Sequence, residues 1–417
     1  MSHPKRSFHF TRQLLSSANQ KGMALIMAVF TVVLITYLVT EVTYETNVEY
    51  LVNSQSMNRL RAYYAAKSGM ELSLLRIKIY SKVQQQFGKQ LGPQAKMLDL
   101  IWSFPFMWPP MAPDDLNEVD KGLIKDKVKE SKMDASYATT ITEEGSKIDL
   151  NDLASPSQNL KEMTQKRLIG IFEAKKKNDE NWARTHQDFE PQKLVNHIID
   201  WIDADQASLN GGDERQYYSN LKDSDNKLPP NRAFRTIEEL RLIPGMTEDF
   251  FKLIENQVTV YGMKAVNPNH ASSEVLQSLD PSITKEVAGE IIKRRESDQM
   301  GGHFKDAQDF WGYVNASGGR VEQSVAQSIP LTFDAVYNFR IKSVGSYSGS
   351  TREITAIVFD LQKSAQQVAG LVKKENPQPG ADGSGGRSGG GAGGTNNSQT
   401  NIIPSKGPPR IVYWNER

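Results

Sequence analysis

The pattern of apolar and polar residues divides the N-terminal part of the chain into an apolar segment and a polar helix. No charged residue occurs from Met23 to Thr40, and about 18 such residues are near the lower limit for a bilayer-spanning helix. Apolar residues then recur at helical spacing among polar ones, for example at Leu60 and Leu74. The pattern predicts one membrane-spanning helix, residues 23–98, that continues into the folded part of the chain.

The same pattern predicts strands on both sides of a helical block. Residues 133–153 alternate between apolar and polar positions and are rich in β-branched residues, which is typical of a strand followed by a turn. Between residues 151 and 330 the apolar residues have helical spacing. Residues 339–361 have the composition of a hairpin and residues 410–417 that of a single strand. This order predicts an α+β head with an inserted all-helical domain.

Charges at both ends of the apolar segment predict its orientation. The positive-inside rule places the leader in the cytoplasm and the bulk of the chain outside, because basic residues precede the segment (Lys5, Arg6, Arg12, Lys21) and acidic residues follow it (Glu41, Glu45, Glu49). The absence of cysteine excludes disulfides and thiol chemistry and fits an exported protein. The formal net charge of +1 gives no global field that would favour nucleic acid.

The junction Lys21-Gly22 lies directly before the apolar segment. A secretory signal would have a shorter apolar core that ends in a small-residue cleavage site, and no such end is evident. The residues leave two interpretations: a one-pass anchor with an uncleaved tail, or a leader that is removed at Gly22 while the following helix is kept. The small Gly22 would give a protease access to the backbone.

Two segments resemble a known family. Lys21-Gly22 resembles a prepilin-peptidase site, and "RLRAYYAAKSGMELSLL" (59–75) resembles the segment of pseudopilins where the long helix enters the head. Its small residues would let other helices approach closely: Ala62, Ala65, Ala66, Ser68 and Gly69. Most pilins have glutamate as the fifth residue of the mature chain, but counting from Met23 places Met27 there. The missing glutamate and the predicted helical insertion are both features of the K-class minor pseudopilins of type II secretion. The chain resembles this class over nearly its whole length.

This resemblance implies the domain organisation. The fold would be an α+β pseudopilin head on a long N-terminal transmembrane pilin helix, with a large inserted helix-hairpin-helix or SAM-like domain. The expected parts are a cleaved leader (1–22), the membrane-spanning helix (23–98), the first part of the head (99–150), the inserted helical domain (151–330), the head strands (331–362), a disordered Gly-rich linker (363–409) and a terminal strand (410–417).

The resemblance also implies processing, location and partners. A prepilin peptidase would cut between Gly22 and Met23, and the new amine of Met23 would be methylated. The chain would cross the inner membrane once, with its bulk in the periplasm. With other minor pseudopilins it would form the tip of the pseudopilus and help to start its assembly, for export of folded proteins across the outer membrane.

A rival interpretation is a membrane-anchored, competence-type DNA-binding protein, because two segments resemble helix-hairpin-helix motifs. Such hairpins bind phosphates through backbone N–H groups that two glycines expose. In the first hairpin Gly245 matches the first glycine, but Thr247 stands at the second; in the later copy Ser282 and Thr284 stand at both. We therefore expect packing modules and no nucleic-acid partner.

The stretch "DWIDADQASLNGGDERQYY" (200–218) concentrates carboxylates around a turn at residues 210–212. Calcium prefers six to eight hard oxygen ligands in a bent loop, which this stretch can supply. From the residues alone, a solvated acidic loop explains it equally well. The K-class resemblance favours calcium, since that family carries calcium in its helical insertion, and the expected ligands are Asp203, Asp205, Asp213 and Glu214. Asp223 and Asp225 form a weaker second candidate.

No catalytic constellation is recognisable. The chain has no thiol nucleophile, and His186 and His197 have neither a partnered serine nor a Glu-x-x-His spacing. We therefore expect a structural protein and no enzyme.

Overall fold

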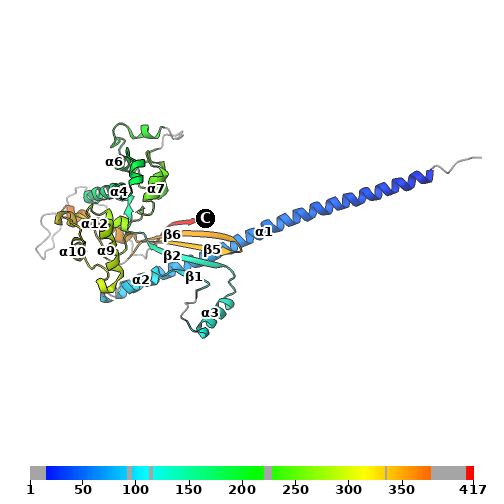
Figure 1. The fold of residues 1–417 in the computed structure, drawn as a ribbon, viewed down its shortest axis with the longest axis horizontal. Coiled ribbons are helices and arrows are strands. Elements are labelled where there is room, and N and C mark those ends of the chain that lie inside the picture. The colour runs from blue at the N-terminus through cyan, green and yellow to red at the C-terminus, as the bar shows by residue number, and fades with distance from the viewer. Residues whose placement is uncertain (1–15, 92–95, 112–115, 220–227, 334–335, 377–409) are drawn as a thin grey trace, which may run out of the picture.

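The computed structural model describes residues 16–91, 96–111, 116–219, 228–333, 336–376 and 410–417. Helix α1 (Ser16–Leu91) projects far beyond a head formed by the rest of the chain (Figure 1). Its apolar first half is exposed, and among the described helices this one is long and apolar enough to cross a membrane. Most of the predicted leader lies outside the described residues.

The second half of α1 packs on an antiparallel five-stranded sheet. The strands are β1 (Phe106–Trp108), β2 (Ser136–Glu143), β5 (Phe339–Tyr347), β6 (Ser350–Phe359) and β7 (Arg410–Glu416), in the order β1-β2-β5-β6-β7. Met70, Ile77 and Tyr80 of α1 form one core with Phe339 and Ile341 of β5. The helix is thus part of the head as well as the stalk.

Small residues let α1 approach this sheet closely. A Cβ atom added to Gly345 of β5 would lie 2.1 Å from the carbonyl oxygen of Ala62, and one added to Gly69 would lie 2.6 Å from Oγ of Ser343. The hydroxyl of Ser343 donates a hydrogen bond to the carbonyl of Ala66 (2.6 Å). Ala62, Ala66 and Gly69, expected to admit other helices, therefore contact the chain's own sheet.

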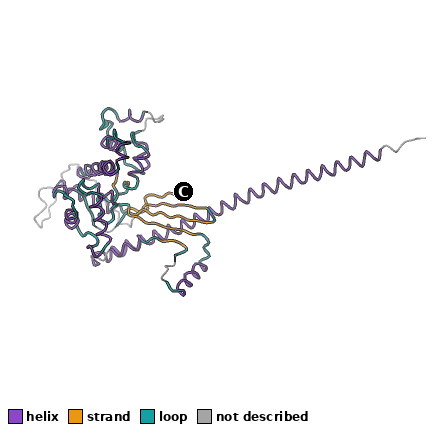
Figure 2. Tube along the Cα trace, viewed as in Figure 1, coloured by secondary structure: helices purple, strands orange, loops and turns teal. Residues whose placement is uncertain are grey.

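The helical unit is inserted between β2 and β5, which confirms the predicted α+β fold with its helical insertion (Figure 2). Its helices are α4 (Gln158–Asn178), α5 (Glu180–Thr185), α6 (Pro191–Asp200), α7 (Glu248–Ile254), α8 (Ser273–Gln277), α9 (Lys285–Glu296), α10 (Ala307–Ala316) and α11 (Gln323–Ser328). One core lies around Trp201 and a second around Phe310. A short parallel pair, β3 (Ile148–Asp149) and β4 (Val258–Thr259), lies in the first half of this unit.

Three segments differ from the predicted boundaries. Helix α1 ends at Leu91, and a separate α2 (Lys96–Ser103) follows, where one helix to residue 98 was expected. The head also contains α3 (Glu118–Glu130). Assigning the linker to start at residue 363 was wrong, because α12 (Leu361–Glu375) is a helix whose first N–H groups are capped by Asp360. The rest of the predicted linker, 377–409, lies outside the described residues.

Candidate metal centre

The acidic stretch joins the end of α6 to a short 3₁₀ helix. Pro191 occupies the first turn of α6, and Leu194, Val195 and Ile198 bury one face of it at helical spacing. This packing carries Asp200, the last residue of the helix, into the interior. Asp213 caps the 3₁₀ helix Glu214–Tyr218, which returns the chain toward Asp200.

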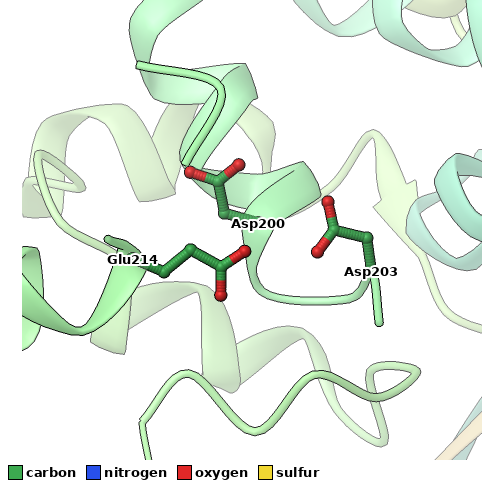
Figure 3. A group of neighbouring side chains, drawn as sticks. All are labelled: Asp200, Asp203 and Glu214. Carbon is green, nitrogen blue, oxygen red and sulfur yellow. The ribbon is translucent and has the colours of Figure 1, made fainter. Parts of the chain in front are cut away.

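Three carboxylates meet here. Asp200, Asp203 and Glu214 each offer an oxygen, and these oxygens all lie within 4.8 Å of one another (Figure 3). Asp200 and Glu214 are buried and Asp203 is half-buried. One oxygen of Asp203 and one of Glu214 are buried without a hydrogen-bond partner.

The structure brings together only two of the four expected ligands. Asp205 and Asp213 are outside the group, and each instead accepts a hydrogen bond from a backbone N–H two residues ahead, both at 2.8 Å. Asp200 was not among the four expected ligands, but it belongs to the group. Its three-residue spacing from Asp203 across the end of a helix was a usable signal, since such residues share a face. Asp223 and Asp225 lie outside the described residues.

Burial and mutual repulsion shift the pKa values of the three carboxyl groups. Burial raises the pKa of Asp203 to about 6, with further repulsion from Asp205 and Asp200. Burial, with Asp203 and Asp200 nearby, raises the pKa of Glu214 to about 7. Burial opposes ionisation of Asp200, but the nearby His197 ring and hydrogen bonds from the Ser208 hydroxyl and the Leu209 N–H outweigh it and lower its pKa. A divalent ion would offset this repulsion, and hard carboxylate oxygens are the ligands calcium prefers.

The two histidines of this region make packing contacts. His186 stacks on Trp182, with ring centroids 4.4 Å apart. His197 Nδ1 lies 3.7 Å from a carboxylate oxygen of Asp200, beside the metal group. Gly22 and Met23, the expected processing residues, lie on α1 and are exposed.

A second titratable group lies where the head meets the helical unit. His270 is packed against Trp102 of α2, with Nε2 3.5 Å from Asp99 Oδ2 and Nδ1 4.0 Å from Glu143 Oε2. Burial is the main cause that raises the pKa of Glu143 to about 8. The charges of Asp99 and Glu144 raise this pKa further, while a hydrogen bond from Ser146 and the charge of Arg295 lower it. Burial, with His303 and Arg295, lowers the pKa of His270 to about 3. Both groups are therefore neutral at pH 7.

We expect this joint to make stability depend on pH in a defined window. Unfolding releases the proton of Glu143 at any pH between 4.5 and 8, while unfolded His270 takes up a proton between pH 3 and 6.5. The two effects cancel from pH 4.5 to 6.5. Of these two groups only Glu143 acts above pH 6.5, and it lowers stability by up to about 2 kcal/mol by pH 8. Glu214 and Asp152, with pKa values of about 7, add to the fall only below that pH.

Glu143→Gln should remove the contribution of Glu143 to this fall, most clearly above pH 7, because a neutral amide has no proton to lose. Thermal unfolding of the full chain in detergent, followed from pH 6.5 to 8.5, measures it. Glu130→Gln on the exposed helix α3 is the matched control and should keep the parental pH dependence. Parallel curves for both variants would contradict the assignment.

Comparisons with known proteins bear on the fold of the chain and of its inserted unit. Residues 146–263 match a family model for the first domain of type II secretion system (T2SS) protein K, and residues 266–330 match a second model for protein K. A chain of the crystal structure of the GspK-GspI-GspJ complex from the enterotoxigenic Escherichia coli type 2 secretion system is similar in fold. The TM-score is 0.50 at 15% identity, over 75% of this chain and 95% of that chain. No curated protein matched the sequence.

By its fold, the chain is of the pseudopilin class: a long N-terminal helix packed on a sheet, with an inserted helical unit. The two adjoining matches cover residues 146–263 and 266–330 of that unit, over which the chain is similar to type II secretion system protein K. Together with the likeness in fold, they support a minor pseudopilin of the K class.

Proposed function

We propose that the chain is cut after Gly22 by a prepilin peptidase, methylated at Met23, and held in the inner membrane by the first half of α1, with its head in the periplasm. The observation that carries this is the form of α1. One helix is exposed and apolar at its start and enters the core of the head at its end. Removal of the leader would therefore leave the head anchored.

We also propose that the head sits with other minor pseudopilins at the tip of the pseudopilus and helps to start its assembly. The likeness to a chain of the GspK-GspI-GspJ structure supports such partners.

The processing proposal predicts that Gly22→Val stays uncut. Nothing lies within 4 Å of a Cβ placed on Gly22, so valine would leave the fold undisturbed and would only obstruct the protease. The chain is co-expressed with a prepilin peptidase, and the mass of its N-terminal peptide is measured. Ala24→Val, equally exposed on α1, is the control and should be cut normally. A parental chain that still carries residues 1–22 would refute the proposal.

The fold also bears on the DNA-binding rival. Thr247 and Thr284, which stand in place of the phosphate-exposing glycines, each cap the following helix and accept a hydrogen bond from its third N–H. These N–H groups are thus already occupied by the chain itself. We expect no binding of duplex DNA at physiological salt, and a specific complex there, weakening steeply as salt is added, would favour the rival.

We propose calcium as the ion at Asp200, Asp203 and Glu214. The support is the set of three hard-oxygen donors with two unpartnered buried oxygens. Backbone carbonyls and water would complete the coordination. Calcium there would fix the end of α6 to the loop that follows it.

A further inference from the structure

Strand β7 is attached to the edge of the head sheet in the manner of a bound peptide. It pairs antiparallel with β6 from Phe359↔Arg410 to Ile354↔Glu416, beside the C-terminus marked in Figure 1. Every residue of β7 is exposed or half-buried, and Ile411 and Trp414 keep 46% and 37% of their surface exposed. Backbone pairing therefore provides most of its attachment.

The edge that β7 occupies is formed without it. Ile354, Ala356 and Val358 of β6 belong to the core shared with α1, and β6 pairs along its length with β5 on its other side. None of the four hydrophobic cores of the described residues includes a residue of β7. In addition to the backbone hydrogen bonds with β6, Glu416 of β7 accepts a hydrogen bond from the hydroxyl of Tyr63 on α1 (3.3 Å). Removal of β7 would leave a preformed, unpaired strand edge.

The connection to β7 is far longer than the path it must cover. Helix α12 starts next to the end of β6 and runs 15 residues, or about 21 Å, to Glu375, which is fixed by a hydrogen bond from Ser157. The chain must then return roughly that distance to Arg410, opposite Phe359. Residues 377–409 can span up to roughly 115 Å. Chain length therefore does not confine β7 to its own β6.

We propose that the edge of β6 is a strand-docking site that also accepts Arg410–Glu416 from a second copy of this chain, so that two copies can exchange their C-terminal strands. This goes beyond the function proposed above. A tether of this length holds its own strand at an effective concentration in the millimolar range. Docking within one chain therefore prevails in dilute solution, and exchange requires copies crowded by their anchors in one membrane.

The lack of cysteine makes the exchange directly measurable. Thr355 and Asn415 are opposite each other in the β6–β7 register and are both half-buried, within the range that a disulfide can bridge. Full chains carrying T355C or N415C, with different tags, are reconstituted into the same lipid vesicles and oxidised. We expect a mixed dimer several-fold above that of T355C with S317C, a cysteine of similar exposure at the end of α10. The double variant T355C/N415C should close within one chain.

A pair of deletions separates exchange from random collision. Deleting residues 377–407 leaves two residues, which reach about 10 Å and cannot return from α12 to the edge of β6. This variant should convert to dimers and raise the mixed cross-link, whereas deleting only 377–391 should behave as the full chain. Internal closure of T355C/N415C without a mixed dimer above the S317C control would overturn the proposal. So would a cross-link that deletion of 377–407 fails to increase.

Discussion

Calcium is expected to raise the melting temperature of the full chain in detergent. An ion that binds the folded state alone stabilises it by about 2.7 kcal/mol at a hundredfold excess over its dissociation constant. Magnesium should do much less, because its small, strict octahedron suits three carboxylates on a bent loop poorly. Melting with chelator, with calcium and with magnesium compares the three states. Equal melting points would return the acidic stretch to a solvated loop.

The variants for this test follow from the geometry. Asp203→Asn combined with Glu214→Gln keeps the shape of the site and removes two of its charges. It should abolish the calcium response and leave the chelated protein no less stable, since the burial and repulsion that raise both pKa values no longer act on a carboxylate. Asp188→Asn, an exposed acid that precedes α6, is the control and should respond as the parent does.

The calcium response should also depend on pH. The carboxyls of Asp203 and Glu214 have pKa values of about 6 and 7, so protons compete with the ion below neutral pH. We expect a larger shift in melting temperature at pH 8 than at pH 6. A response that is equal at both pH values would place the ion elsewhere.

Gly345→Val is expected to unfold the head. A Cβ at this position would lie 2.1 Å from the carbonyl oxygen and 2.4 Å from the backbone nitrogen of two residues of α1, Ala62 and Ala66. Backbone cannot rotate away as a side chain can, so α1 must separate from β5 and the core around Met70 opens. The loss should be more than about 3 kcal/mol, at or beyond the upper end for overpacked cores.

Denaturant unfolding measures this loss. It is followed by tryptophan fluorescence, to which Trp102 in the core between α1 and the sheet contributes. The matched control is Gly289→Ala in α9, where nothing lies within 4 Å of the added atom. Alanine should there stabilise by about 0.5–1 kcal/mol, as expected in a helix interior. A Gly345→Val chain as stable as its parent would mean that α1 does not pack on the sheet as described.

The sequence predicted the fold where the periodicity was unambiguous. The apolar segment, the hairpin of β5 and β6 and the terminal strand β7 were all recognisable, because long runs of alternating or helical spacing indicate one type of element. Whether β7 joins the sheet was open from the sequence, and the structure shows that it pairs with β6. Helix α12 was not predicted, because residues 363–375 were assigned to the Gly-rich linker although the run rich in glycine begins only after the helix ends.

The candidate site was only partly predictable. Sequence spacing located the acidic stretch. It could not show that the carboxylates of Asp205 and Asp213 instead accept hydrogen bonds from nearby backbone N–H groups. Nor could it show that packing of α6 turns Asp200 inward. The joint of Glu143, His270 and Asp99 was invisible for the same reason, since its members come from three segments that only the tertiary fold brings together.

The central claim is that this chain acts as a minor pseudopilin among others of its kind. The most direct measurement is co-expression of the full, processed chain with the other minor pseudopilins of its own secretion system, followed by detergent extraction and determination of the mass of the complex. We predict one complex that contains this chain together with the others. If the others associate while this chain, cut at Gly22 and folded, elutes alone, the claim is contradicted.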